Sequence, residues 1–117
     1  MANCSVALPD LFHALGDPTR LAIVGKLGNG PTSVSALAAP FAMALPSFMK
    51  HLAVLERSGV VRSTKAGRIR TCELEPQALT QAERWMATQR AMWETRSDRL
   101  ATFVENLHLE QQSRGKR

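Results

Sequence analysis

Residues 45–74 have the sequence LPSFMKHLAVLERSGVVRSTKAGRIRTCEL, which changes from a helical to an extended pattern partway along. In the first half, Phe48, Leu52 and Leu55 fall on one side of a helical wheel. Apolar residues at this spacing are typical of a helix that buries one face. We therefore expect a helix over residues 46–58, with these three side chains in the core.

The second half of this stretch predicts a β-hairpin. Gly59 ends the helix, and residues from Val60 to Arg62 begin an extended segment. A polar turn, Lys65–Arg68, contains a glycine and separates this segment from a second one, Ile69–Leu74. Two extended segments joined by such a short turn are typical of an antiparallel pair of strands.

Three shorter helices are expected upstream. Apolar residues at helical spacing predict the first over residues 9–15. Asp17 can accept hydrogen bonds from the free amides of a second helix, which ends in the glycine-rich residues 28–31. Ser33 can cap a third helix in the same way, and Pro40 limits its length. The third and fourth helices then form a helix-turn-helix.

Beyond Pro76 the chain is expected to form one helix to about residue 110. Thr80 and Glu83 have the spacing of a capping box, which predicts that the helix starts there. We therefore expect a mainly α fold with a β-hairpin wing, a winged helix-turn-helix, as a single domain over residues 1–110. Residues 111–117 are predicted to be a flexible basic tail.

The positive charge of the chain is concentrated in its middle. The whole sequence has 15 basic and 10 acidic residues, a net charge of +5. Residues 47–70 carry six of the basic side chains and one acidic side chain, Glu56. The entire net charge therefore lies on the fourth helix and the hairpin. A localised positive field is what binding to a polyanion requires, and a solvated charged face is the alternative.

These features predict a surface that binds double-stranded DNA. The outward face of the fourth helix is short and cationic at its centre, and such a helix fits the major groove. A basic hairpin beside it would follow the phosphate backbone or enter a minor groove. For His51, a structural role at the edge of the core is an equal alternative. The predicted contacts are Ser47, Met49, Lys50, His51 and Arg57 on the helix, and Arg62, Lys65, Arg68 and Arg70 on the hairpin.

A second pattern lies on the last helix. Apolar side chains recur along it at alternating spacings of three and four residues, which is typical of a helix that packs against another helix. A chain of this size offers few surfaces to cover such a face, so we expect a homodimer through the terminal helices, with packing within the chain as the alternative for part of the face. The predicted interface comprises Leu11, Phe12 and Leu15 from the first helix and Met86, Trp93, Leu100, Phe103 and Leu107 from the last.

Other classes of protein are disfavoured. The three histidines lie on separate elements, and no acid–base pair or phosphate-binding loop is present, so we expect no enzyme. Scattered cysteines and histidines do not make a zinc site, and we expect no metal and no cofactor. Glycines and prolines interrupt the uncharged residues 27–49, which argues against a membrane-spanning helix. Without a targeting segment or a disulfide framework, a reduced cytoplasmic protein is expected.

Several short motifs resemble a known family. The sequences Leu15–Arg20 (LGDPTR), Met49–Leu55 (MKHLAVL), Ser58–Val61 (SGVV) and Gly67–Arg68 are similar to the ArsR/SmtB family of bacterial winged-helix repressors. The resemblance covers residues 8–75 in order. It implies homodimers that bind operator DNA near their own promoter and are released by an inducer, here unknown. By position, it places Ser47, Met49, Lys50 and His51 on the recognition helix and Lys65, Arg68 and Arg70 on the wing.

The chain departs from the family's sensing motifs. The arsenic-type members have a cysteine pair on the third helix, where this chain has Ser35–Ala39. The zinc-type members have an Asp-x-His arrangement on the last helix, but no histidine follows Asp98 at that spacing. The chain therefore resembles the branch that lacks the usual metal sites. Two alternatives stay open: a protein-interaction module on a winged-helix scaffold, and a repressor that responds to a metal or to thiol chemistry at Cys4 or Cys72.

Overall fold

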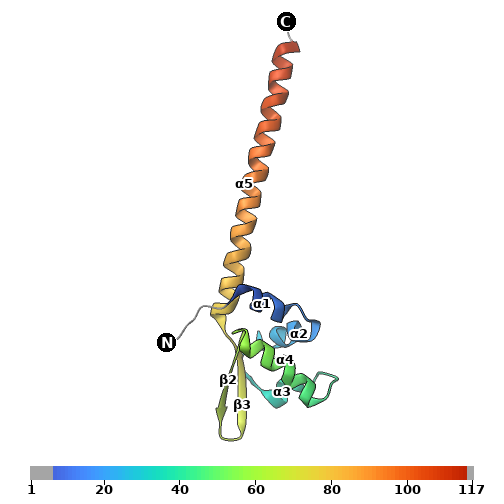
Figure 1. Ribbon diagram of the computed structural model, residues 1–117, viewed down its shortest axis with the longest axis vertical. Helices are drawn as coiled ribbons and strands as arrows, with labels where there is room; N and C mark the ends of the chain where they lie inside the picture. The colour runs from blue at the N-terminus through green and yellow to red at the C-terminus, as the bar shows by residue number, and fades with distance from the viewer. Residues whose placement is uncertain (1–6, 116–117) are drawn as a thin grey trace. The chain divides into compact units, whose positions relative to one another are not determined.

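A computed structural model describes residues 7–115, which fall into two units. The first unit ends at Ala82, and the second is the part of the last helix that begins at Glu83. In chain order, the elements are α1(Leu8–Leu15), α2(Pro18–Leu27), β1(Thr32–Ser33), α3(Val34–Ala38), α4(Leu45–Arg57), β2(Val61–Ala66), β3(Ile69–Leu74) and α5(Pro76–Gly115) (Figure 1).

The fold is mainly α with a small antiparallel sheet, which confirms the predicted winged helix-turn-helix. Strand order in the sheet is β1-β3-β2. The two-residue strand β1 was not predicted, because it is too short to show an alternating pattern. Its residue Thr32 pairs with Cys72, so the segment before α3 is fixed to the hairpin. The hairpin packs against the helices, with β2 on α4 and β3 on α2 and α3.

Both predicted helix caps in the first unit are present. The Asp17 carboxylate accepts a hydrogen bond of 3.1 Å from the Arg20 amide at the start of α2. At the start of α3, the Ser33 hydroxyl accepts one of 3.1 Å from the Ala36 amide. Each cap satisfies an amide that has no partner within its own helix. The sequence therefore determines where these two helices begin.

The β2–β3 hairpin is hereafter called the wing and comprises residues 61–74. Its register pairs Val61 with Leu74 and Ala66 with Ile69, so Gly67–Arg68 form a two-residue loop. The Gly67 φ angle is +63°, a value that L side chains rarely adopt. Glycine at the first loop position is typical of type II′ turns, whose twist matches that of the strands. The glycine thereby fixes where the wing turns.

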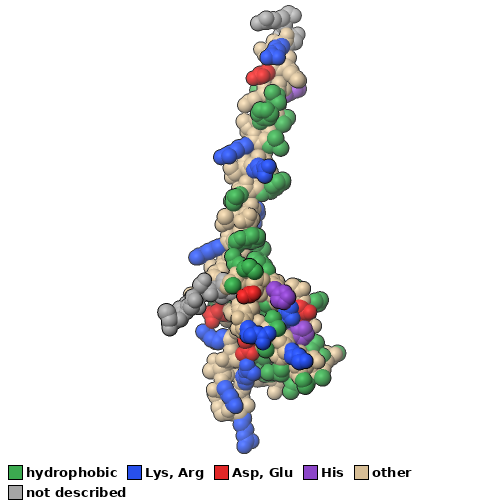
Figure 2. Space-filling view, in the orientation of Figure 1, with side chains coloured by type: hydrophobic (Ala, Val, Ile, Leu, Met, Phe, Trp, Pro, Cys, Tyr) green, Lys and Arg blue, Asp and Glu red, His purple; other side chains and the backbone are tan. Residues whose placement is uncertain are grey.

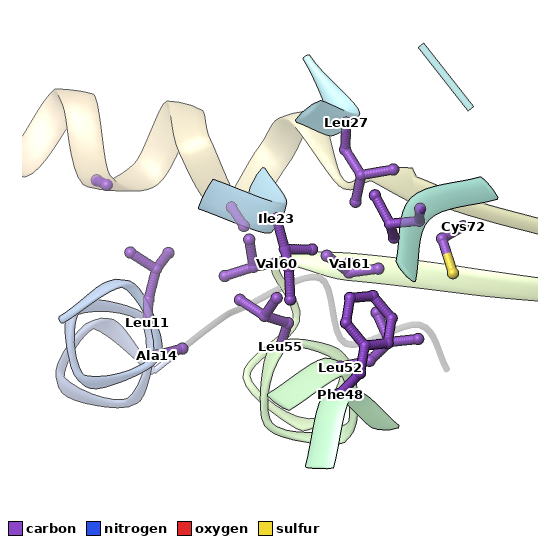
Figure 3. Close-up of a cluster of buried hydrophobic side chains, with 13 residues drawn as sticks. Leu11, Ala14, Ile23, Leu27, Phe48, Leu52, Leu55, Val60, Val61 and Cys72 are labelled. Carbon is purple, nitrogen blue, oxygen red and sulfur yellow. The ribbon is translucent and has the colours of Figure 1, made fainter. Parts of the chain in front are cut away.

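The core of the first unit lies between the helices and the wing (Figure 3). Phe48, Leu52 and Leu55 of α4 are fully buried or nearly so, as their spacing predicts, and they point toward Ile23 and Val60. Phe41 packs on Phe48 with the two ring centroids 5.4 Å apart. Further core residues are Leu11, Ala14, Leu27, Leu37, Val61, Cys72, Ala78 and Ala82.

Helix α5 begins earlier and ends later than predicted. It starts at Pro76, directly after the wing, and the Thr80 hydroxyl donates to the Pro76 carbonyl at 3.0 Å inside the first turn. The prediction of a capping box is therefore wrong, because proline already suits a helix start. At the other end, residues 111–115 continue the helix instead of forming a flexible tail. Residues 116–117 lie outside the described part.

Beyond Ala82, α5 has no buried side chain among the described residues. From Glu83 onward every described side chain is exposed except Ser97, which is partly so. Nevertheless, this part of the helix carries many large apolar side chains. Within residues 7–115, no helix is long and apolar enough to cross a membrane. The exposed apolar residues are Trp85, Met86, Met92, Trp93, Leu100, Phe103, Val104, Leu107 and Leu109.

Candidate nucleic-acid interface

Helix α4 presents a polar, cationic face to solvent. Ser47 and Lys50 are exposed on its N-terminal half, opposite or beside the face that is buried in the core. Arg57 is also exposed, but it lies at the C-terminal end, where it lines a pocket of about 360 Å³ with Asp10 and His13 of α1. Residues near the N-terminal end of a recognition helix reach base edges most easily. Of the two cations on α4, Lys50 is therefore the better placed for a base contact.

Met49 is less available than the sequence indicates. It is only partly exposed, because it packs against the core cluster of the first unit. Val54 packs there in the same way, whereas Leu45 at the start of α4 is 57% exposed. Met49 and Val54 therefore contribute less to the outward face of α4 than the sequence indicates, and Leu45 is its large exposed apolar residue.

His51 contacts other protein groups. Its Nδ1 lies 3.3 Å from Arg20 Nη1 and 3.6 Å from Asp17 Oδ2. Arg20 also donates to the end of α1, from Nε to the Ala14 carbonyl at 2.7 Å and from Nη2 to the His13 carbonyl at 3.3 Å. The hydrogen bond from the Arg20 amide, followed by the nearby charges, lowers the pKa of Asp17. His51 thus links α4 to α2, which favours its structural role over a phosphate contact.

The tip of the wing carries two exposed cations. Lys65 lies opposite Arg70 in the strand register, and Arg68 occupies the two-residue loop. Figure 2 shows basic side chains along the wing and on the neighbouring helical part of the first unit. Within residues 7–115, neither Lys65 nor Arg68 forms an ion pair with a carboxylate. Both side chains can therefore reach a phosphate without first leaving a partner.

Arg62 is already paired within the protein. Its Nη2 donates to Glu73 Oε1 at 2.7 Å, and its Nη1 lies 3.4 Å from Glu75 Oε2. The hydrogen bond to Glu73, together with the two negative charges, raises the pKa of the Arg62 guanidinium. A phosphate contact by Arg62 would have to compete with these carboxylates, so we leave it out of the proposed DNA contacts.

The guanidinium of Arg70 is paired as well. Its Nη2 donates to both carboxylate oxygens of Glu56, at 2.7 and 2.6 Å. The Ser63 hydroxyl donates to the same carboxylate. Arg70 therefore joins the wing to α4, and it is not a free cation like Lys65.

Cys72 is a buried core residue, as its alternation with Leu74 predicts. Its side chain is inaccessible, its Sγ lies 3.7 Å from Ser63 Oγ, and burial raises the pKa of the thiol. A buried thiol with a raised pKa reacts slowly, because the thiolate is the reactive form. Cys4 lies outside the described residues. Among residues 7–115, no group of three histidine, cysteine or carboxylate side chains is arranged to hold a metal ion.

The predicted dimer-interface residues divide into two sets. Leu11 is fully buried in the core of its own protomer, so its assignment to a dimer interface is wrong. Phe12 and Leu15 are partly buried against the same core. The predicted residues on α5 are all exposed, with fractions from 45% to 67%, and they comprise Met86, Trp93, Leu100, Phe103 and Leu107.

Two important residues were missed by the sequence reasoning, Arg20 and Glu56. Arg20 was visible only as part of the LGDPTR motif, and its contacts join segments that are far apart in the sequence. Glu56 had a clearer signal, because it is the single acid among the basic residues 47–70. An isolated acid in a basic segment indicates a specific partner, which the structure identifies as Arg70.

Comparison with known proteins agrees with this geometry. The helix-turn-helix domain family HTH_20 matches residues 15–64. The HTH-type transcriptional regulator Rv2034 of Mycobacterium tuberculosis is 38% identical over 68 residues, which are 58% of this chain and 64% of Rv2034. The chain thus spans just under two thirds of that relative. The transcriptional repressor SdpR of Bacillus subtilis is 29% identical over 77 residues, 66% of this chain and 86% of SdpR.

A solved structure is more similar still. The crystal structure of the ArsR family transcriptional regulator RHA00566 has 54% sequence identity to this chain and a TM-score of 0.70. The match covers 74% of this chain and 90% of that one. A sequence identity of 54% over 90% of the second protein shows membership of the same family, and not only the same fold. As its motifs predict, the chain belongs to the ArsR family of transcriptional regulators.

Proposed function

We propose that this protein is a homodimeric repressor that binds double-stranded DNA through α4 and the wing. In each protomer, α4 enters the major groove with Ser47 and Lys50 facing the bases, and Lys65 and Arg68 contact the backbone beside it. The observation that carries this proposal is the set of exposed cations on these two adjacent elements. The helix-turn-helix match and the relatives named as transcriptional regulators support it.

The wing and α3 also present polar groups together. Arg68 and Arg70 line a pocket of about 250 Å³ with Ser33 and Ser35 at the start of α3. Hydroxyl and guanidinium groups are common partners of phosphate oxygens in protein–DNA complexes. Because Glu56 already holds Arg70, Arg68 and the two hydroxyls are the groups of this pocket that would contact a DNA backbone passing the wing and α3.

We propose that the chain pairs with a second copy, because α5 carries exposed apolar side chains that no other described residue covers. Met86, Trp93 and Leu100 are spaced seven residues apart, and Phe103 and Leu107 continue the same stripe at spacings of three and four. This pattern is typical of helices that pack in pairs. A two-fold dimer would also present two copies of α4 to successive turns of DNA.

Repression is proposed from the same geometry. A dimer bound across a promoter occludes polymerase, and the relative SdpR is named as a repressor. We propose that the protein acts on its own promoter and that a signal which lowers its DNA affinity releases it. The burial of Cys72 argues against that thiol as the sensor. The absence of enzymatic activity stays a prediction.

Electrophoretic mobility shift with the protein's own upstream DNA tests the proposal. Specific binding is expected, with an affinity that falls steeply as salt rises, because each neutralised phosphate releases counterions. Lys50→Ala should weaken binding to this DNA by about tenfold and binding to unrelated duplex much less, as expected for a base contact. No duplex binding even at low salt would overturn the proposal and favour a protein-interaction module.

Lys26→Ala is the matched control for this substitution. Lys26 is an exposed lysine on α2, outside the proposed interface, and its loss changes the net charge by the same amount. Its effect on both DNA probes should be small. If Lys50→Ala instead weakens both probes equally, Lys50 is a phosphate contact and does not read the sequence.

A further inference from the structure

We propose that Glu56 is a positioning residue for DNA binding, which fixes the wing on α4 so that both elements meet one duplex together. This inference rests on the proposed function, and it concerns a residue whose charge is opposite to that of the surface around it.

Glu56 connects three elements of the first unit. It lies in the last turn of α4, and its side chain is 23% exposed. Its two oxygens accept hydrogen bonds from Arg70 on β3, and one of them also accepts from Ser63 on β2. One carboxylate therefore holds both strands of the wing against the helix.

These contacts are suited to fixing an angle. The base of the wing is packed in the core through Val61 and Cys72, but residues 64–69 beyond it are exposed, so the outer part of the wing can bend and twist relative to α4. Hydrogen bonds between charged groups are shorter and stronger than neutral ones, and Arg70 Nη2 contacts both oxygens of Glu56. The hydrogen bond from Ser63 attaches β2 to the same carboxylate. The wing tip, with Lys65 and Arg68, is thereby held at one position relative to Lys50.

By its charge alone, Glu56 would weaken the binding of DNA to this surface. Its negative charge repels phosphates, and its pairing neutralises Arg70, so the carboxylate lowers general attraction to DNA. A residue with only an electrostatic effect would therefore improve DNA binding when its charge is removed. A positioning residue would impair specific binding when its charge is removed. The two roles predict opposite changes.

Glu73 provides a matched comparison on the same wing. It also pairs with an arginine, but its partner Arg62 is its cross-strand neighbour on the wing itself. No contact of Glu73 with α4 is found in the described part of the chain. Neutralising Glu73 therefore removes the same charge and leaves Arg62 with its contact to Glu75, without removing any contact between the wing and α4.

Binding measurements on Glu56→Gln and Glu73→Gln separate these roles. The specific probe is a duplex that the wild-type protein selects from random-sequence DNA, and the other probe is a scrambled duplex of equal length. Glu56→Gln should bind the specific duplex about tenfold more weakly, because a charged, two-strand anchor is lost. On the scrambled duplex it should bind as tightly as wild type or more tightly. Glu73→Gln should bind both duplexes at least as tightly as wild type.

Arg70→Lys tests the anchor without changing net charge. A lysine keeps the positive charge, but its side chain is shorter and its ammonium lacks the planar, directional donors of a guanidinium, so it should not hold Glu56 in the same position. It should therefore reproduce the loss of specific binding with no gain on the scrambled duplex. Thermal melting of each variant identifies any that fails to fold, and a folded Arg70→Lys keeps the test informative if Glu56→Gln unfolds.

The outcomes distinguish this inference from the proposed function. If the wild-type protein selects no duplex, the proposed function itself fails. If it selects one, and folded Glu56→Gln binds that duplex as tightly as Glu73→Gln does, Glu56 does not position the wing. Equal binding by folded Arg70→Lys and wild type would overturn the inference in the same way.

Discussion

The two units of the molecule differ in what covers their apolar side chains. In the first unit, residues 7–82, side chains from helices and strands bury one another, and Phe48 is 1% exposed. In the second unit, from Glu83 to the end of the described helix, residues as large as Trp93 are 67% exposed. The first unit has its own core, and the second is a helix with an apolar stripe and no core.

This difference shows where each unit obtains its stability. Burial of apolar area within a protomer stabilises the first unit at any protein concentration. If a second copy covers the stripe, as we propose, it stabilises the second unit by mass action, so the stability of that unit should depend on protein concentration. Substitutions in the core of the first unit should therefore lower the unfolding free energy at every protein concentration. Substitutions in the stripe of the second unit should change dimerisation.

The largest effect is expected from Phe48→Ala in the core. Removing a buried phenylalanine loses its transfer free energy and leaves a cavity, which typically costs about 3–5 kcal/mol of unfolding free energy. Chemical denaturation followed by circular dichroism measures this loss, and it should be the same at low and high protein concentration. Met92→Ala, which changes an exposed residue of α5, should alter unfolding far less. Equal losses from the two substitutions would contradict the contrast between the units.

A smaller effect is expected from charges placed in the stripe of α5. The double substitution Leu100→Glu and Phe103→Glu should convert a dimer into a monomer, because like charges would face each other across the seam. Sedimentation velocity measures the change in mass. The affinity for the specific duplex should fall by about 100-fold. A monomer binds one half-site and gains nothing from a second α4 linked to it.

Thr102→Glu is the control for this substitution. Thr102 is exposed on α5, on the side of the helix away from Leu100 and Phe103. It adds one negative charge, where the double variant adds two, and places it outside the stripe, so the dimer should persist. A double variant that remains dimeric would show that another surface holds the two copies together.

Local sequence patterns were sufficient for much of the first unit. The spacing of Phe48, Leu52 and Leu55 identified the buried face of α4, because each lies on the same side of a helix with 3.6 residues per turn. Asp17 and Ser33 identified two helix starts, because capping is a contact between residues only three positions apart. Such contacts are encoded within a few residues, so they can be read without knowing the fold.

Contacts between distant segments could not be read in this way. The partners of Arg62 and Arg70 depend on the register of the wing and on its packing against α4. Leu11 has the helical spacing of both a core residue and an interface residue, and only the packing of α1 shows that it belongs to the core. The charge pattern therefore located the candidate interface but overestimated its number of free cations.

The smallest expected effect concerns polar links, which also differ between the two units. In the first unit, Asp17 caps α2 and lies beside Arg20 and His51 of α4, an arrangement that joins separate helices. In the second unit, the Arg90–Glu94 pair at 3.7 Å lies within one helix and is well exposed. Exposed pairs of this kind contribute little to stability. Asp17→Asn should therefore lower the melting temperature slightly near neutral pH, and Glu94→Gln should not.

The pH dependence gives this comparison its sharpest form. The hydrogen bond from the Arg20 amide and the neighbouring charges lower the pKa of Asp17 in the folded protein. A lowered pKa stabilises the fold above the unfolded value of about 4, and this contribution is lost as the pH falls through the folded pKa. An asparagine side chain in place of Asp17 keeps a cap without titrating, so the melting temperatures of wild type and Asp17→Asn should converge as the pH falls below about 4. A gap that persists unchanged into acid would mean that the carboxylate charge of Asp17 stabilises nothing, and that the link between α2 and α4 is held by Arg20 alone.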